Sequence, residues 1–298
     1  MMPAMTTDTL EVAHDQVEGD GPVLLETLSP SRAGDFKVCP QLFKFKAIDR
    51  IPVPPTVHQA RGTTAHLALQ RLFDHPADDR TPQRLYDLFR DAWAELKPTE
   101  FPDLFDDLHG GLDAERFWGI ESLEILANYF RVEDPGAIDP VGRELDLRED
   151  LGDITIRGIL DRVEEGPAGL VITDYKTGKA PPERYAIPAF FALKIYGVLV
   201  RKHLGRAPVA LRLLYLNGPT VYEIAVTDAQ LDAMERQLDA LWERINRAII
   251  DDHFPTRPGK LCDWCQYRDR CPAFAAEVAG AVTPLPVEVA GAVSAATG

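Results

Sequence analysis

The hydrophobic pattern of the chain changes its period at about residue 138, and this change constrains the fold more than any other feature. Before it, residues 63–73 (TTAHLALQRLF) and 113–130 (DAERFWGIESLEILANYF) repeat apolar side chains at helical spacing. After it, residues 138–149, 152–165 and 169–178 alternate apolar and polar side chains between short Gly or Asp turns. The pattern predicts a helical region followed by three successive strands.

The later part of the chain adds helices and strands to this sheet. A helix is predicted from Pro182 to Leu204, and strands follow at 209–216 and 220–226. Thr227 and Gln230 have the spacing of a capping box at the start of a last helix. The order β-β-β-α-β-β-α after a helical region predicts an α/β fold, with a mixed sheet flanked by helices.

The first strongly periodic helix is expected to begin close to Gly62. Thr63 or Thr64 has a hydroxyl that can accept a hydrogen bond from the first free amides, so either can cap the helix there. The side chains that would share its apolar face are Ala65, Leu69, Leu72 and Phe73.

The two ends of the chain differ in composition from the rest. Residues 1–25 are acidic and have no periodicity, and residues 275–298 are rich in small residues and interrupted by Pro. Both ends are expected to be disordered tails. A single domain is expected between them, at 26–274, with a helical region at 60–132, an α/β core at 138–252 and a cysteine-bearing segment at 255–274.

Charge is unevenly distributed along the chain. The formal net charge of −15 argues against a protein that coats nucleic acid with its whole surface. However, residues 175–218 contain eight basic residues and one acid, and residues 32–61 contain six basic residues and two acids. Such a distribution allows a cationic groove on a molecule whose other faces are acidic.

The segments that would indicate a membrane or secreted protein are missing. No apolar window approaches the roughly 18 uninterrupted residues of a membrane span. Residues 1–21 have neither the basic nor the apolar region of a secretory signal. A cytoplasmic location is therefore expected.

Two acids and a lysine fall at the ends of neighbouring predicted strands. Asp174 and Lys176 are two residues apart, so they share one face of their strand, and Asp161 ends the strand before it. Two close carboxylates repel each other unless a cation lies between them, and Mg²⁺ or Mn²⁺ takes oxygen ligands. A lysine beside the ion can orient the attacking water and stabilise charge on a phosphate.

The sequence GILDRV (158–163), followed by LVITDYKTG (170–178), resembles the core motif of the RecB-family exonucleases in the PD-(D/E)XK nuclease superfamily. The resemblance spans roughly residues 28–274. It implies a restriction-endonuclease-like fold and metal-dependent DNA hydrolysis. It also implies that Asp161, Asp174 and Tyr175 bind the metal and that Lys176 is catalytic.

The resemblance implies three further site residues. RGTTAH resembles the family's Gly-x-x-x-His helix, which makes His66 a further metal ligand. Glu144 lies where the family commonly has an acid on the first core strand. Tyr196 matches the Tyr of a Gln-x-x-x-Tyr motif, but Ala192 replaces the Gln, and Lys194 is close enough in sequence to contact a DNA phosphate instead.

The expected nucleic-acid contacts come from the basic segment. Lys179, Arg184 and Lys194 are expected to hold the phosphate backbone of DNA, bound as a single strand or at an end. The chain has no Gly-x4-Gly-Lys-Ser/Thr loop, so no use of ATP is expected. A separate helicase or repair protein is a compatible partner.

The four cysteines are split into one and three: Cys39, then Cys262, Cys265 and Cys271. Disulfides are not expected in a cytoplasmic chain of this size. Zinc or an iron–sulfur cluster, each bound by four thiolates, remains. The same layout in iron–sulfur RecB-like nucleases, including the AddB subunit and CRISPR adaptation nucleases, implies a [4Fe–4S] cluster rather than zinc, acting as a clasp between segments more than two hundred residues apart.

Three functions remain open from the sequence. The first is a stand-alone, metal-dependent DNA exonuclease of repair or recombination. The second is a cluster-stabilised DNA-binding or partner-dependent scaffold without catalysis, which Ala192 favours. The third is an interaction protein with a zinc clasp.

Overall fold

The computed structural model describes residues 25–106 and 109–275. The α-helices are α1 (Pro30–Val38), α2 (Pro40–Phe43), α3 (Val57–Leu72), α4 (Pro82–Glu100), α5 (Gly111–Ala127), α6 (Tyr129–Val132), α7 (Phe190–Leu204) and α8 (Asp228–Ile250). A π-helical turn follows α2, and short 3-10 turns lie elsewhere: Lys44–Ile48 (π), then Ala77–Asp79, Pro135–Ala137, Glu183–Tyr185, Ile187–Ala189, Lys260–Trp264, Arg268–Arg270 and Pro272–Phe274. The predicted tails lie outside the described residues, except at Leu25, which is buried, and Ala275.

One mixed sheet of five strands forms the centre of the molecule. The strands are β1 (Pro140–Leu151), β2 (Ile154–Gly166), β3 (Gly169–Lys179), β4 (Ala210–Asn217) and β5 (Thr220–Ala225), and their spatial order follows the sequence. β1, β2 and β3 pair antiparallel, β4 is parallel to β3, and β5 is antiparallel to β4. Helix α7 makes the crossover that the parallel pair requires. The predicted α/β fold with a mixed, helix-flanked sheet is confirmed.

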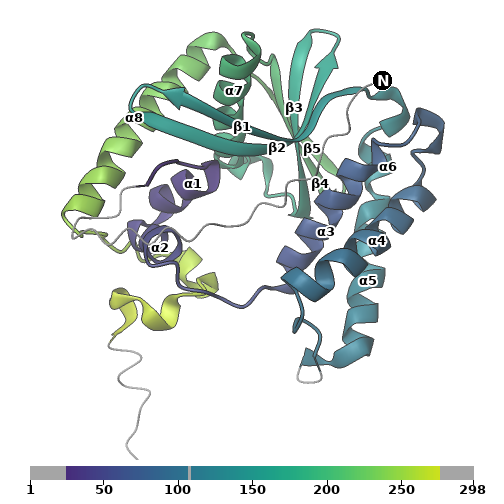
Figure 1. Cartoon of the computed structure of the whole chain (residues 1–298), viewed down its shortest axis with the longest axis horizontal. Coiled ribbons are helices and arrows are strands. Elements are labelled where there is room, and N and C mark those ends of the chain that lie inside the picture. Colours follow the sequence, from purple (N-terminus) through teal and green to yellow (C-terminus); the bar gives the residue numbers. More distant parts are fainter. Residues whose placement is uncertain (1–24, 107–108, 276–298) are drawn as a thin grey trace, which may run out of the picture.

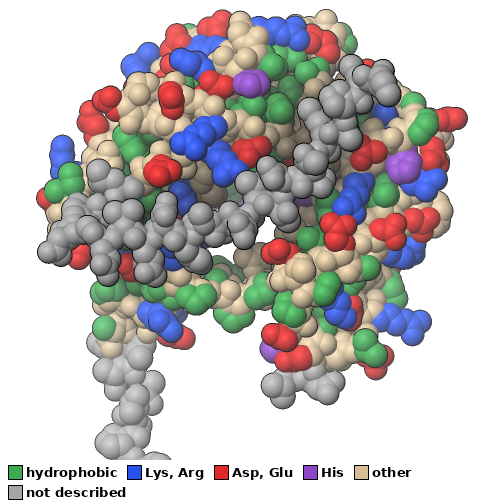
Figure 2. All heavy atoms as spheres, in the orientation of Figure 1, with side chains coloured by type: hydrophobic (Ala, Val, Ile, Leu, Met, Phe, Trp, Pro, Cys, Tyr) green, Lys and Arg blue, Asp and Glu red, His purple; other side chains and the backbone are tan. Residues whose placement is uncertain are grey.

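Helices cover both faces of the sheet (Figure 1). One face packs against α1, α7 and α8, and the other packs against α3, α4, α5 and α6. β4 shows the division most directly, because Leu211 and Leu213 enter the first core whereas Leu214 and Leu216 enter the second. On the surface in Figure 2, basic and acidic side chains are interspersed, and the molecule is hollowed between its two halves.

The start of α3 differs from the prediction. Thr56 is the N-cap and forms a capping box with Gln59, so the helix runs straight through Gly62. The cap expected at Thr63 or Thr64 is wrong; the Thr64 hydroxyl instead donates to the Ala60 carbonyl, 2.7 Å away, inside the helix. The expected apolar face is confirmed, since its members Ala65, Leu69, Leu72 and Phe73 are all buried.

The start of α7 also differs from the prediction, whereas the start of α8 agrees with it. The helix expected from Pro182 begins at Phe190, after two 3-10 turns. Pro188 explains the difference, because it has no amide hydrogen and its ring collides with the preceding turn of an α-helix. The capping box of Thr227 and Gln230 at the start of α8 is confirmed.

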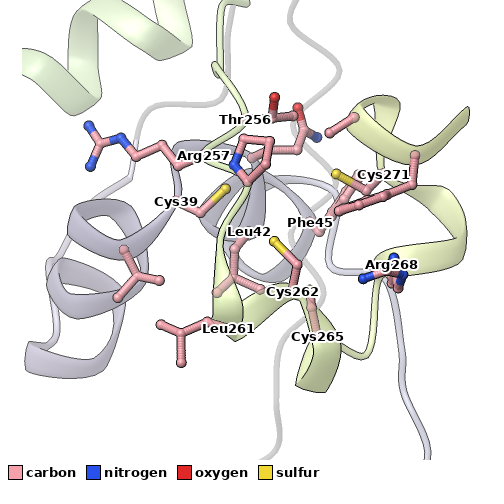
Figure 3. Close-up of a pocket in the computed structure, with 15 residues that line it drawn as sticks. Cys39, Leu42, Phe45, Thr256, Arg257, Leu261, Cys262, Cys265, Arg268 and Cys271 are labelled. Carbon is pink, nitrogen blue, oxygen red and sulfur yellow. The ribbon is translucent and has the colours of Figure 1, made fainter.

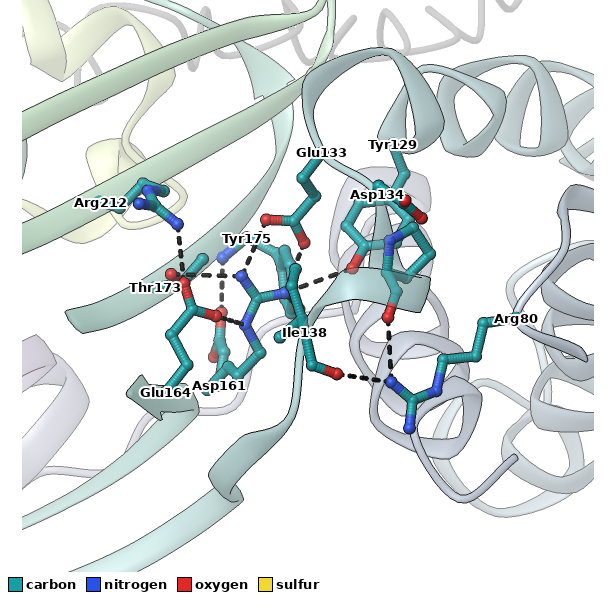
Figure 4. A network of polar contacts seen from close by, with 12 residues as sticks. Arg80, Tyr129, Glu133, Asp134, Ile138, Asp161, Glu164, Thr173, Tyr175 and Arg212 are labelled. Carbon is teal, nitrogen blue, oxygen red and sulfur yellow. Dashed lines mark hydrogen bonds and ion pairs between the residues drawn. The ribbon is translucent and has the colours of Figure 1, made fainter. Parts of the chain in front are cut away.

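A buried arginine on β2, Arg162, ties the sheet to the helical layer. Figure 4 shows its partners Glu133, Glu164 and Tyr175 around it. Arg162 is 1% exposed, and its two Nη atoms contact the carboxylate of Glu133, which follows α6, at 2.5 and 2.8 Å. Its Nε lies 2.6 Å from Glu164 Oε2, and its Nη1 donates to the Tyr175 hydroxyl at 2.7 Å. Glu164 is also paired with Arg212 on β4, at 2.7 Å. The network fixes β2 at the residue after Asp161.

We expect R162M to lower the free energy of unfolding by about 3–5 kcal/mol, because Glu133 would keep a charge in a nearly buried place without its partner, and Glu164 would keep Arg212 as its one cation. Urea unfolding followed by circular dichroism measures the change. The matched control is R157M on the same strand, whose ion pair with Asp146 is exposed. Equal losses in the two variants would contradict this account of the network, and adding E133Q and E164Q to R162M should recover part of the loss.

Candidate metal centre

Asp161 and Asp174 lie where β2 and β3 separate. The last residue pair between these strands is Arg162 with Thr173, and the two aspartates are the next residues on either side. Beyond this pair, β2 continues with β1 and β3 continues with β4. The amide of Tyr175 donates to Asp161 Oδ2 at 2.7 Å. The separation of the strands therefore leaves room for two carboxylates at one place.

Asp174 and Lys176 form a close ion pair. Lys176 Nζ is 2.5 Å from Asp174 Oδ2. The Asp174 side chain is buried, whereas that of Lys176 is 41% exposed, so the ammonium can meet a ligand from solvent. The two side chains lie on one face of β3, as residues i and i+2 must.

His66 on α3 faces two carboxylates of the sheet. Its Nδ1 lies 3.3 Å from Asp161 Oδ1 and 3.9 Å from Glu144 Oε1. Each of these three residues offers one ligand atom, and the three atoms all lie within 4.8 Å of one another. Asp174 is outside this compact set. Its carboxylate lies beside the set, on the neighbouring strand.

Glu144 reaches the centre from an unusual backbone conformation. Its φ is 42°, in the left-handed region that is uncommon for residues other than Gly. Such conformations are concentrated at functional sites, where the surrounding structure enforces them. Here the neighbouring pairs, Arg143 with Arg162 and Leu145 with Leu160, hold β1 against β2 on either side of Glu144.

Tyr175 contributes its backbone rather than its ring. The carbonyl of Tyr175 accepts a hydrogen bond from His66 Nε2 at 3.0 Å, while its buried ring meets the His66 ring edge-on, with 6.1 Å between centroids, and its hydroxyl accepts from Arg162. A histidine that binds a metal usually donates its other ring N–H to such a carbonyl, which fixes the ring. With Nε2 so occupied, Nδ1 points at Asp161 and Glu144. The donor set therefore fits a divalent cation.

The charges around the centre shift the pKa values of its members. Burial alone would lower the pKa of His66, but Asp161, Asp174 and Glu144 raise it to about 9. Burial, and then the charge of Asp161, raises the pKa of Asp174 to about 6, against the opposing effect of Lys176. Burial and Asp161 also raise the pKa of Glu144. Burial and several neighbouring carboxylates together cause these three pKa shifts, and such a concentration of negative charge favours a bound cation or a proton.

Tyr196 approaches the centre from α7, on the other face of the sheet from α3. Burial, followed by the charges of Asp174, Asp161 and Glu144, raises the pKa of its hydroxyl above the usual range. Its ring packs on Gly158 of β2, where a Cβ atom would lie only 2.7 Å from Tyr196 Cε1. Gly158 thus makes room for the tyrosine ring beside the carboxylates.

Some basic residues of the predicted groove form ion pairs with acids, and others do not. Arg201, Arg206 and Arg212 form ion pairs with acids, which removes them from a general cationic surface. Lys179, Arg184 and Lys194 form no ion pair within the part of the chain that the structure describes, and Arg184 stacks on Tyr185, with 4.9 Å between Cζ and the ring centroid.

Two cations that pack against other side chains were not singled out from the sequence. Arg162 follows Asp161 in an alternating strand, but alternation does not reveal a buried cation. Lys37 of α1 lies over the ring of Phe191 on α7, with Nζ 3.5 Å from the centroid, and burial and the charge of Lys194 lower its pKa. Its position in the basic stretch at residues 32–61 was the available signal.

The four cysteines line one small cavity between the α1–α2 region and the segment that follows α8 (Figure 3). Cys39 lies between α1 and α2, Cys262 lies in a 3-10 turn after α8, and Cys265 and Cys271 lie beside such turns. All four are free thiols, and burial raises the pKa of Cys271, as do the three neighbouring cysteines. No three of these sulfur atoms, all of which are described, lie within 4.8 Å of one another, so they form no compact ligand set.

Among the described residues, no helix combines the length and the apolar character needed to cross a membrane.

Comparison with known proteins gives a family, one similar protein sequence and two solved structures of limited similarity. Residues 27–272 match the family described as the PD-(D/E)XK nuclease superfamily. The chain is similar to the Gene 69 protein of Mycobacterium phage D29, with 25% identity over 281 aligned residues that cover 85% of this chain and 98% of the phage protein. It resembles a solved structure from Eubacterium rectale described as a "Putative exonuclease", with a TM-score of 0.49, 16% identity and coverage of 81% of this chain and 88% of that one. It also resembles the structure of SSO0001, with a TM-score of 0.37, 15% identity and coverage of 87% and 89%.

The family match covers most of the chain and includes every residue of the centre described above. This chain belongs to the PD-(D/E)XK nuclease superfamily.

Proposed function

We propose that this chain is a metal-dependent DNA exonuclease of the RecB type, acting on single strands or ends in DNA repair or recombination. The observation that carries the proposal is the set of His66, Glu144 and Asp161 beside the Asp174–Lys176 pair. The proposed nuclease domain spans residues 26–274. We propose a cytoplasmic location, a compartment in which cysteines that form no disulfide stay reduced.

His66, Glu144 and Asp161 would hold Mg²⁺ or Mn²⁺, and Asp174 would complete the oxygen ligands from β3. When bound, the ion would lower the pKa of a water and neutralise charge on the phosphate under attack. The Tyr175 carbonyl orients His66, as the hydrogen bond to Nε2 requires. Tyr175 is therefore proposed to act through His66, with its side chain outside the site.

Lys176 would orient the attacking water and stabilise charge on the phosphate. Asp174 holds its ammonium at 2.5 Å, and the charges of Asp174 and Asp161 raise the pKa of Lys176 against the effect of burial, so it stays protonated at neutral pH. A fixed cation at this place stabilises charge that develops on phosphate oxygens. Tyr196, on the α7 side of the same carboxylates, would contact the strand. Lys179, Arg184 and Lys194 would contact its phosphates.

The second candidate is a DNA-binding or partner-dependent scaffold without catalysis. Ala192 favours it, because this residue provides no amide to position a substrate beside Tyr196. End-labelled single-stranded DNA incubated with the protein and Mn²⁺ distinguishes the two functions. Labelling each end in turn also gives the direction of digestion, and a helicase or repair protein would be needed only if the isolated chain binds DNA without cleaving it.

For the cysteine cavity we propose a [4Fe–4S] cluster. Tetrahedral zinc, at about 2.3 Å from each thiolate, would draw the sulfurs to about 3.8 Å from one another. A [4Fe–4S] cluster has its own iron and sulfide atoms between its four thiolates, and the position of all four cysteines on one cavity supports it. Cys39, Cys262, Cys265 and Cys271 would be its ligands.

We expect D174N to reduce Mn²⁺-dependent cleavage of single-stranded DNA by roughly 10³-fold, because it removes a charge that both the ion and Lys176 require. The rate is measured with labelled oligonucleotides at saturating Mn²⁺. D146N is the matched control, since Asp146 is an exposed carboxylate of β1 that pairs only with Arg157 among the described contacts. Cleavage at the wild-type rate by D174N would refute the proposed site.

Metal binding should release about one proton per ion at pH 7.5. His66, with a pKa of about 9, is mostly protonated at this pH, and its Nδ1 must lose the proton to bind a cation. Affinity should therefore rise as the pH rises toward 9. Calorimetric titration with Mn²⁺ in buffers of different ionisation enthalpy counts the protons. The H66Q variant should release about one proton fewer, and an unchanged count would exclude His66 as a ligand.

Anaerobically purified protein should contain about four iron atoms per chain and absorb visible light, as iron–sulfur clusters do. Elemental analysis measures the iron and the zinc together. C271S should contain less iron, because it removes one of the four proposed ligands of the cluster. Stoichiometric zinc with no iron in the wild-type protein would instead establish the zinc clasp.

A further inference from the structure

β3 contains a bulge immediately after Lys176. In the pairing with β4, Lys176 is opposite Tyr215, but the next pair is Lys179 with Asn217. Two residues of β3, Thr177 and Gly178, therefore span the distance of one residue on β4. A bulge of this kind leaves a residue outside the ladder and turns backbone groups and side chains away from the regular pleat.

A cavity of about 290 Å³ opens at this bulge. The end of β3, the end of β4 and the first turns of α3 form its walls. Its lining residues are His58, Arg61, Thr177, Gly178, Lys179 and Asn217. None of these six is acidic, although the whole chain has a net charge of −15. The lining is therefore neutral or cationic, in contrast to the chain as a whole.

The cationic side chains of the cavity differ in how firmly they are held. Arg61 is buried, and its Nε donates to the Ser122 hydroxyl at 3.0 Å while its Nη2 contacts Glu121. Lys179 is exposed, and no described residue forms an ion pair with it. Lys179, at the end of β3, is thus the cation that can turn toward a ligand, whereas Arg61 is held in place on α3.

The cavity is close to the metal centre along both of its walls. On β3, Thr177 directly follows Lys176. On α3, His58, Gly62 and His66 are four residues apart and share one face, so His58 lies about 12 Å from His66 along the helix. Gly62 lies between them against the bulge, since a Cβ atom there would be 3.7 Å from the Thr177 hydroxyl.

We propose that this cavity binds a phosphate group of the DNA strand next to the phosphate that is cleaved. The inference rests on the proposed nuclease function and adds a subsite to it. An ammonium, an imidazole, a hydroxyl and an amide all provide hydrogen-bond donors to phosphate oxygens. Gly178 allows a close approach, because nothing lies within 4 Å of the position that its Cβ would take. The phosphate can be an internal one or the terminal one of a strand end.

The test is the binding of fluorescent single-stranded oligonucleotides in EDTA, so that no cleavage occurs. K179A should weaken binding and make the plot of log K against log salt shallower by about 0.7, the value for one phosphate contact on a single strand. G178V adds bulk in open space and should fill the cavity without changing charge; it should weaken binding as well. K202A, at an exposed lysine near the end of α7, is the control and should bind like wild type.

Three oligonucleotides separate the two sources of phosphate: one with a 5′-phosphate, one with a 3′-phosphate and one with hydroxyls at both ends. Equal losses on all three indicate an internal phosphate, and a loss confined to one phosphorylated strand indicates a terminal phosphate at that end. Either result supports the subsite. Wild-type binding by both K179A and G178V overturns it. So does a loss in K179A without a loss in G178V, or an equal loss in K202A, because each shows general attraction rather than a bound phosphate.

The binding test is independent of the nuclease test. Urea unfolding of each variant verifies that G178V and K179A are folded. If wild-type protein fails to cleave DNA with Mn²⁺, the proposed function fails, yet binding in EDTA still reports on the cavity. If wild-type protein cleaves and the variants bind normally, only the subsite is wrong.

Discussion

Crowding of carboxylates at one point of the sheet is the constraint on which the rest of the structure depends. Asp161, Glu144 and Asp174 come from three adjacent strands, and each raises the pKa of another titratable group in the centre. Without a metal, protonated His66 supplies the compensating charge. A fold that places such carboxylates together loses stability through their repulsion, which protonated His66 offsets in part and a bound cation offsets further. The same arrangement that costs stability therefore creates affinity for a divalent ion.

Two opposite charges on consecutive residues keep this arrangement in register. Asp161 points to the metal centre, and Arg162 points to the opposite face of β2, where Glu133 and Glu164 hold it. A slip of one residue in the pairing of β2 would exchange these side chains between faces. It would then bury Asp161 among acids and move Arg162 into the centre. The buried network therefore selects the one register in which the centre exists.

The sequence predicted much of the fold, because its strongest signals are local. Alternation over residues 138–178 marked β1, β2 and β3, and the capping box at Thr227 marked α8. The starts of α3 and α7 were predicted at the wrong residues, and the causes are local as well. Thr56 caps α3 with a capping box, and Pro188 prevents an α-helix from beginning at Pro182. The geometry of the metal centre could not be predicted from local patterns. Its compact set includes Glu144, whose left-handed φ no pattern reveals, and excludes Asp174. Arg162 was missed because burial of a charge depends on partners far apart in the sequence.

The cysteine cavity joins segments that the polypeptide already holds together. Arg257 donates to the Lys37 carbonyl, Tyr267 donates to the Ile51 carbonyl at 3.1 Å, and Lys44 Nζ is 2.6 Å from Asp252. A group bound by the four thiols would thus find its ligands already brought near one another by protein contacts. Its stabilising effect would come mainly from restricting the unfolded chain, in which Cys39 and Cys262 are more than two hundred residues apart. Because Lys37 lies two residues before Cys39 and packs on α7, such a group would also affect the position of α1 near Lys194.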